Sequence, residues 1–356
     1  MTSQSLLAPE RAVGRAGRAD GPVSRTAARR TGWLIGAAAL LLLAVLLSLA
    51  VGSRGISPLT VVDALLHGGH SEEAVVVRTL RMPRTVVGLA VGAALGLAGT
   101  VMQGITRNPL AEPGILGVSQ GAAMAVVVAI AVFGVSSLEE YVWFAFAGAI
   151  LAVVIVYTIA GRGRSGVSPV KLALAGAAFS ALMASVTSAV LTTNAATLDQ
   201  YRFWQVGALG GRSLEMAAQM LPFLIAGVLL VFAVARGMDA LALGEDMASG
   251  LGQRVAVIRV LGALGATLLT GVAVAAAGPV AFAGLAAPHL ARLLVGAAHR
   301  WVLCLSALLG SSLLLVADVM GRVLFPPEEV PAGAMTALIG VPALVLLVRG
   351  KRVVAG

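Results

Sequence analysis

Long apolar runs separated by short polar connections dominate the chain and predict membrane-spanning helices. Most runs approach twenty residues, and an α-helix of that length rises about 30 Å, the thickness of the hydrocarbon core of a bilayer. Backbone polar groups in lipid have no water to bond, so helices are the form expected for these runs. The pattern predicts about ten spans, near residues 33–51, 84–106, 114–134, 141–161, 170–192, 216–235, 256–278, 280–296, 301–321 and 332–349.

Composition agrees with this pattern, since 59% of the residues are hydrophobic and only 12% are charged. A soluble domain usually carries about 25% charged residues. The formal net charge of +9 would suit a nucleic-acid partner, but the basic residues lie between apolar runs and in residues 1–32 rather than on one face. Residues 1–32 are predicted to be a disordered basic cytoplasmic tail. We therefore expect an all-α polytopic membrane protein with a transmembrane domain at 33–356.

The distribution of basic residues between the predicted loops sets the orientation. With about ten spans, a cytoplasmic N-terminus puts most arginines and lysines on the cytoplasmic side, as the positive-inside rule demands. Both termini are then cytoplasmic. An odd number of spans per half would place the halves, about 33–192 and 216–349, in inverted orientations, a common transporter plan. The arginines that fall on the opposite side, against the trend, include Arg81, Arg84, Arg212 and Arg322.

The chain carries no motif for hydrolysing ATP or another substrate. A phosphate-binding loop needs Gly-x4-Gly-Lys-[Ser/Thr], and the one Gly-Lys pair, at Gly350, is followed by Arg352. The sequence also lacks His-Glu-x-x-His and a polar catalytic cluster, which argues against a membrane enzyme. Few ionisable side chains fall near the span centres, which argues against a self-powered secondary transporter. We therefore expect a partner protein to supply the energy for transport.

Two neighbouring segments carry the most information about function. RMPR at 81–84 opens a run in which glycine recurs at every fourth position (Gly88, Gly92 and Gly96). This spacing predicts a smooth stripe that lets another helix approach closely, and packing within one chain would explain it. The run ends in RNPLAEPG at 107–114. Its two prolines flank a short polar connection and predict a rigid loop between two helices.

With these segments the chain resembles the FecCD-type permease family of ABC importers for iron-siderophores, haem and cobalamin, which has a BtuC-like fold. The resemblance reaches from about residue 55 to 350, nearly all of the chain outside the basic tail. It implies about ten helices per subunit, two permease subunits around a central pathway and two cytoplasmic ATPase subunits beneath them. The matching segments are RMPRTVVGLAVGAALGLAGTVMQ, RNPLAEPGILGVSQGA, LALGEDMASGLG, GPVAFAGLAAPHLARLLVG, ADVMGR and EEVPAGAMTALIGVPALVLLV.

The resemblance assigns Arg81, Arg84 and Arg322 to docking of an extracytoplasmic substrate-binding protein, which presents acidic side chains from its two lobes. The planar guanidinium group pairs a carboxylate through two hydrogen bonds, which suits this role. The residues alone leave an alternative open. These arginines would then reach lipid headgroups or pair locally with Asp318 or Glu328.

On the cytoplasmic side, residues 237–254 match the coupling loop of the family. The resemblance predicts two short helices here that seat in a cleft of the ATPase. The residues expected to make this contact are Leu243, Glu245, Ala248 and Leu251. A solvated connector is the alternative, but such a connector would not need the apolar residues Leu241, Leu243, Met247 and Leu251.

The resemblance also places a cytoplasmic gate and a pathway wall. The expected gate residues are Asn108 and Leu110 in one loop, and Ser168 and Val170 in another, where Pro169 makes the match loose. Two of the predicted spans, 170–192 and 332–349, are expected to line the pathway. Small residues there would keep the affinity for cargo low, and those expected in the wall are Gly176, Ser180 and Ala184.

These features together predict a multi-pass permease subunit of a binding-protein-dependent ABC importer in the cytoplasmic (inner) membrane, moving ferric siderophore by alternating access. Haem and cobalamin remain alternative cargoes, and the second permease subunit would make a homodimer or a heterodimer. We expect no enzyme activity, metal or cofactor in this chain, with ATP and Mg bound by the ATPase subunits. His289 and Cys304 are expected to be packing residues, since neither has companions at metal-ligand spacing.

Overall fold

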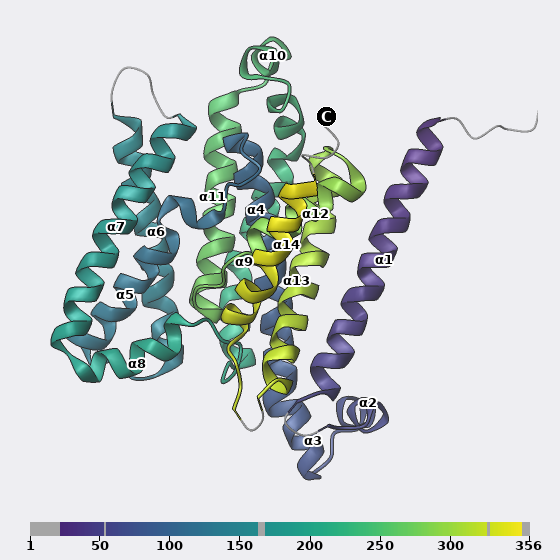
Figure 1. Cartoon of the computed structure of the whole chain (residues 1–356), viewed down its shortest axis with the longest axis vertical. Helices are drawn as coiled ribbons and strands as arrows, with labels where there is room; N and C mark the ends of the chain where they lie inside the picture. Colours follow the sequence, from purple (N-terminus) through teal and green to yellow (C-terminus); the bar gives the residue numbers. More distant parts are fainter. Residues whose placement is uncertain (1–21, 53–54, 163–167, 326–327, 351–356) are drawn as a thin grey trace, which may run out of the picture.

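The computed structural model describes residues 22–52, 55–162, 168–325 and 328–350, and every regular element in these ranges is a helix (Figure 1). The long helices run side by side in a bundle, and short helices lie at its two ends. We call one end the α10 end, after α10 (Glu245–Gly250). The opposite end, called the α8 end, carries α2 (Pro58–Leu66), α3 (Glu72–Val76) and α8 (Ala195–Gln205).

Each apolar run that the sequence predicts corresponds to a helix of this bundle. Within the described ranges, seven helices are long and apolar enough to cross a membrane, while α5, α12 and the apolar part of α14 are shorter. The protein is therefore an integral, multi-pass membrane protein. The bundle helices are α1 (Pro22–Ala50), α4 (Met82–Thr106), α5 (Val118–Phe133), α6 (Leu138–Gly161), α7 (Pro169–Thr193), α9 (Leu214–Leu241), α11 (Val255–Ala277), α12 (Ala283–Val295), α13 (His299–Val323) and α14 (Ala332–Gly350).

Two boundaries differ from the expected ones. α1 begins at Pro22, so the last part of the segment assigned to the basic tail is helical, whereas residues 1–21 lie outside the described ranges. α12 has only 13 residues, because the predicted run at 280–296 starts with an irregular stretch that ends at Phe282. Phe282 has a left-handed backbone (φ 67°), a conformation that a continuing helix cannot contain.

The centre of the bundle is the contact between α4 and α13, and it rests on the glycine stripe. A Cβ atom added to Gly96 would lie 2.2 Å from the carbonyl oxygen of Ser306, and one on Gly92 would lie 2.5 Å from the Cα of Ser311. Thr100 donates a hydrogen bond to Ser306 Oγ at 3.0 Å across the same contact. Small residues let the two backbones approach closely, and dispersion contacts between them stabilise the pair. The stripe is thus explained by packing within one chain.

Corresponding helices of the two predicted halves run in opposite directions (Figure 1). α1 leads from the α10 end to the α8 end, and α9 leads back again. The two short helices, α5 and α12, each follow an irregular loop. Glu112 in the first loop accepts a hydrogen bond from the backbone N–H of Phe282 in the second, at 3.3 Å. A direct polar contact therefore joins the two loops.

Candidate functional site

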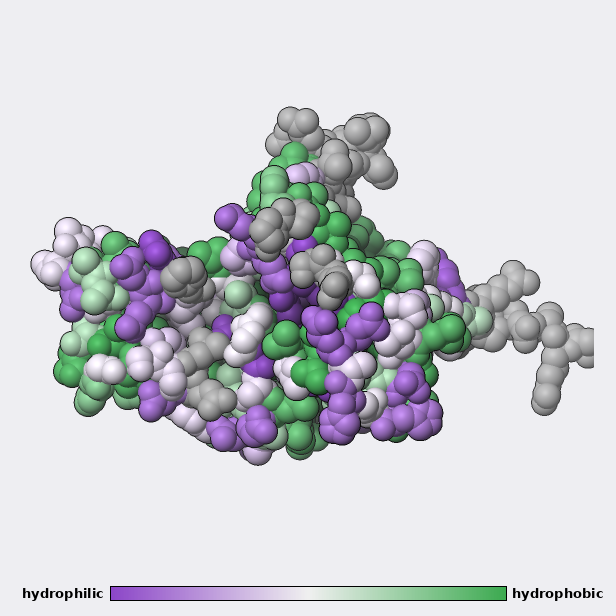
Figure 2. All heavy atoms as spheres, turned by 90° about the horizontal axis from the view of Figure 1, so that it is seen from below, coloured by the Kyte–Doolittle hydropathy of each residue, from purple (hydrophilic) through white to green (hydrophobic). Residues whose placement is uncertain are grey.

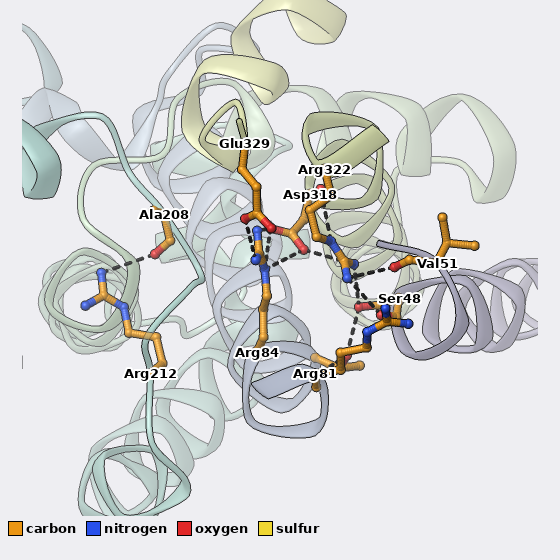
Figure 3. A network of polar contacts seen from close by, with 10 residues as sticks. Ser48, Val51, Arg81, Arg84, Ala208, Arg212, Asp318, Arg322 and Glu329 are labelled. Carbon is orange, nitrogen blue, oxygen red and sulfur yellow. Dashed lines mark hydrogen bonds and ion pairs between the residues drawn. The ribbon is translucent and has the colours of Figure 1, made fainter. Parts of the chain in front are cut away.

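Three charged side chains meet at the α8 end, where α4 begins and α13 finishes (Figure 3). Arg84 donates from Nε and Nη2 to Asp318 Oδ1 at 3.0 and 2.8 Å, and from Nη1 to Glu329 Oε2 at 2.7 Å. Asp318 is fully buried on α13, whereas 42% of the Glu329 side chain is exposed. Charge-assisted pairs of this geometry are the strong kind, and the buried member depends on them most.

Arg81 and Arg322 hold the last turn of α1. Arg322 donates from Nη1 to the carbonyl oxygens of Ser48 and Val51, at 3.1 and 2.9 Å, and pairs with Asp318 at 3.2 Å. Arg81 donates from Nη1 to the carbonyl oxygen of Leu49 at 2.8 Å. The last carbonyls of a helix have no partner within the helix, and positive charge is favoured there. Both arginines are buried, so in this structure they connect helices instead of facing solvent.

The three arginines expected to dock a partner therefore have intramolecular partners. Arg84 and Arg322 pair with Asp318, as the local-pairing alternative predicts, whereas Arg81 bonds to the backbone of α1. The acidic partners are Asp318 and Glu329, whereas the sequence analysis named Asp318 or Glu328. A cavity of about 330 Å³ opens beside them and is lined by Arg81, Arg84, Arg322, Glu329 and a further arginine, Arg212. Four arginines thus line this cavity together with one glutamate, and this excess of positive charge suits an acidic ligand.

The α8 end is also hydrophilic on a larger scale. Figure 2 views the molecule from this end and shows hydrophilic side chains across its middle, with hydrophobic surface along the flanks. Apolar flanks fit contact with lipid, and a polar end fits contact with water or a soluble partner. The arginine cavity lies at this end of the bundle, beside the first residues of α4.

The opposite end carries α10, in the segment expected to couple to an ATPase. The apolar side chains Leu243, Met247 and Leu251 are 63%, 58% and 60% exposed, so an uncovered apolar surface lies on α10 and beside its two ends. Glu245 pairs with Arg259 on α11, which holds the start of α10 against the bundle. Ala248 is fully buried and supports α10 from inside. The segment contains one short helix in addition to the last residues of α9, where two short helices were expected.

The four expected gate residues lie in the loop after α4 and at the start of α7. The Asn108 side chain accepts a hydrogen bond from the backbone N–H of Leu110 at 2.9 Å, which fixes the loop after α4. Ser168 accepts one from the backbone N–H of Lys171 at 3.3 Å and caps α7. Leu110 and Val170 are exposed. Ser168, Glu245 and Arg259 line one cavity of about 370 Å³.

The residues expected in the pathway wall differ in what they face. A Cβ atom on Gly176 would lie 1.9 Å from the carbonyl oxygen of Ile115, so Gly176 packs against the short 3-10 helix η2 (Pro113–Leu116) and faces no open space. Ser180 is half-buried, and Ala184 is exposed on the next turn. Much of α7 is uncovered by the rest of this chain, which fits a helix that meets a pathway, a partner or lipid.

Sequence reasoning offered Asp318 as a local partner of these arginines but missed that it joins Arg84 and Arg322 to each other. Its position four residues before Arg322 on one helix was the available signal. Arg212 was assigned only to a side of the membrane, because its burial follows from tertiary packing. Among the described residues, no group of three His, Cys, Asp or Glu side chains could hold a metal ion.

Comparisons with known proteins agree with this arrangement. A sequence model of the FecCD transport family matches residues 40–350. The ferric enterobactin transport system permease protein FepD of Escherichia coli (strain K12) is 44% identical over 313 residues, covering 88% of this chain and 93% of the relative. The iron(3+)-hydroxamate import system permease protein FhuB of Bacillus subtilis (strain 168) is 40% identical over 321 residues, covering 90% and 83%. An inward-facing metal-chelate type ABC transporter superposes with a TM-score of 0.77 at 30% identity, covering 90% of this chain and 99% of that chain.

Proposed function

This chain belongs to the FecCD transport family, and from that premise we propose that it is the permease subunit of an ABC importer that moves ferric siderophore across the cytoplasmic membrane. The observation that carries the proposal is the placement of two different surfaces at opposite ends of one bundle. An arginine-lined cavity lies at the α8 end, and exposed apolar side chains lie on and beside α10 at the other end. An importer needs a surface for a substrate-binding protein on one side and a surface for an ATPase on the other.

The proposed topology has about ten spans, with the α10 end in the cytoplasm. α1 begins and α14 ends at the α10 end, so the N-terminal and C-terminal helices would both have their outer ends on the cytoplasmic side (Figure 1). The assembly contains a second permease subunit, identical or similar, and two ATPase subunits that bind ATP and Mg. The chain itself is then not an enzyme. Closure of the ATPase subunits would move α10 and switch the pathway between outward-facing and inward-facing states, each with its own contacts to the cargo.

Arg84 is the proposed contact for the substrate-binding protein, because it is the least buried of the three expected docking arginines and its second partner, Glu329, is partly exposed. An acidic side chain of the binding protein would take the place of Glu329. We predict that Glu329→Gln tightens docking about fivefold, since the competing carboxylate is gone, and that Arg84→Lys weakens it about fivefold, since the two-bond geometry is lost.

Surface plasmon resonance with the assembled transporter in nanodiscs would measure both affinities. The two substitutions change neighbouring partners of one ion pair and are expected to act in opposite directions. Equal effects, or none, would remove Arg84 from docking. Asp318 stays in place in both variants, so the buried part of the cluster is retained.

The exposed apolar side chains on and beside α10 are the proposed contact for the ATPase. We predict that Leu251→Glu weakens ATPase attachment about tenfold, because it places a charge where an apolar side chain would be buried. Leu59→Glu serves as the matched control, since Leu59 is an exposed leucine on α2 at the other end. Co-purification of the ATPase in detergent gives the readout. Normal recovery from the Leu251 variant, or equal loss from both variants, would contradict this coupling role.

The gate and pathway roles remain proposals on the same premise. Asn108, Leu110, Ser168 and Val170 would close the cytoplasmic side, and Ser180 and Ala184 would face the pathway. Gly176 would contribute indirectly, by holding α7 against η2, since its own position is filled.

Uptake of radioactive iron by cells deleted for the gene tests the proposed function. Ferric siderophores, haem and labelled cobalamin are offered separately, with and without the restored gene. Selective loss of ferric-siderophore uptake, restored by the intact gene, is the expected result. Selective loss of haem or cobalamin uptake would keep the importer and change its cargo. Normal uptake of all three would reject the proposed cargo class.

A further inference from the structure

A second cavity, of about 410 Å³, lies beside the arginine cavity at the α8 end. Its walls come from α6, α8, the loop between α8 and α9, and the residue before α14. Gly210 and Arg212 belong to the walls of both cavities, so the two are neighbours. The size falls in the range of small-molecule sites, which is about 300–1,000 Å³. The side chains that matter for its chemistry are Tyr141, Gln200, Trp204 and Arg212.

Three buried donor atoms in this wall have no acceptor among the described residues. They are Nε and Nη1 of Arg212 and Nε1 of Trp204. Arg212 is only 6% exposed, and its Nη2 donates to the carbonyl oxygen of Ala208 at 3.1 Å. Figure 3 shows its guanidinium apart from the group formed by Arg84, Asp318 and Glu329, on the side of Ala208. Buried donors are normally satisfied, so these three call for an acceptor from outside the chain.

The charge of the cavity wall also favours an acceptor from outside the chain. The residues that line the cavity include Arg212 and no Asp or Glu. Burial lowers the pKa of Arg212 to about 10, so the group is still protonated at neutral pH. A buried charge without a counter-ion costs several kcal/mol of stability. An anion that accepts hydrogen bonds from Arg212 and Trp204 would offset that cost.

We propose that this cavity binds an oxygen-rich anionic chelate, and that it receives carboxylate, catecholate or hydroxamate oxygens of the ferric cargo at the outer mouth of the permease. The proposal rests on the proposed function. The Tyr141 hydroxyl donates to Gln200 Oε1 at 3.1 Å, which leaves the Gln200 amide N–H groups as further donors for such oxygens. The aromatic rings of Tyr141 and Trp204 supply apolar wall area, as small-molecule sites usually do. These features suit a chelator arm better than a single acidic side chain.

Citrate, a tricarboxylate, and its uncharged ester triethyl citrate are the probes for a direct test. The assembled transporter in nanodiscs, without substrate-binding protein, is titrated with each probe by isothermal calorimetry. The variants are Arg212→Gln and Trp204→Phe, and the matched control is Arg202→Gln. Arg202 is an exposed arginine on α8 that does not line the cavity. We expect saturable citrate binding that falls about tenfold or more in Arg212→Gln and severalfold in Trp204→Phe, with Arg202→Gln unchanged and the ester unbound.

Other results would overturn the inference. Equal loss in Arg202→Gln would mean non-specific attraction to surface charge. Unchanged citrate binding in Arg212→Gln, with weaker docking of the binding protein, would assign Arg212 to an acidic side chain of that protein instead. Iron uptake by wild-type cells separates failure of the anion site from failure of the proposed function, because that uptake does not depend on the Arg212 variant. Normal ferric-siderophore uptake in wild type, together with unchanged citrate binding in Arg212→Gln, would reject the anion site alone.

Discussion

Asp318→Asn is expected to lower the free energy of unfolding by about 3–5 kcal/mol, because it removes the negative partner from a buried charge cluster. Asp318 is fully buried between Arg84 and Arg322, which lie 2.8 and 3.2 Å from its oxygens. The amide keeps the size of the side chain and loses its charge. Two guanidinium groups then remain in an apolar setting with only Glu329 to compensate them. The last turn of α1 should loosen as well, since Arg322 holds it.

Glu329→Gln is the control for this prediction. It also removes a negatively charged partner of Arg84, but the Glu329 side chain is 42% exposed. Exposed ion pairs contribute only about 0–1 kcal/mol. Thermal unfolding of the purified protein in detergent, followed by tryptophan fluorescence, compares the two variants. A large loss for Asp318→Asn and a small one for Glu329→Gln is expected. Equal losses would mean that burial of Asp318 does not decide the energetics of the cluster.

Gly96→Ala is expected to destabilise the protein by about 3 kcal/mol, the upper end of the range for overpacking a filled interior. The new methyl group would lie 2.2 Å from the carbonyl oxygen of Ser306, and a backbone atom cannot rotate away. α4 and α13 would have to separate along the stripe, with loss of the Thr100–Ser306 hydrogen bond. Detergent melting curves give the readout here too.

Gly36→Ala is the matched substitution, because Gly36 lies in α1 with open space around it. Alanine favours a helix over glycine by roughly 0.5–1 kcal/mol, so this variant should be unchanged or slightly more stable. If glycine-to-alanine substitution lowers stability at Gly96 but not at Gly36, then the close approach of α4 and α13, and not helix propensity, decides the change in stability. A loss of stability in both variants would contradict the packing account.

The membrane helices were predictable from the sequence because a bilayer imposes length and apolarity on each span. The elements that the hydrophobic pattern missed are α2 and α3, which are short and carry polar residues, so no long apolar run marks them. The short helix α8 also lies outside the apolar runs. The start of α1 was also missed, since Pro22 opens a helix whose first residues are basic and polar.

The candidate site was harder to predict, because burial decides what each residue does. Arg81 and Arg322 stood out in the sequence because they fall on the side of the membrane that has few basic residues. Their bonds to the end of α1, however, depend on helices far apart in sequence. A small residue in an apolar run looks the same whether it lines a pathway or packs inside. Gly176 and Ala248 therefore appeared exposed in the sequence interpretation and are buried in the structure.

Transport by purified components tests whether this chain is a permease driven by a separate ATPase. Proteoliposomes would contain this chain, its second permease subunit and the ATPase subunits, with ATP inside and the binding protein loaded with radioactive ferric siderophore outside. We expect saturable iron uptake that needs ATP, the binding protein and this chain together. Uptake that continues without ATP, or that a proton gradient alone sustains, would contradict a permease driven by a separate ATPase and would support a self-powered transporter.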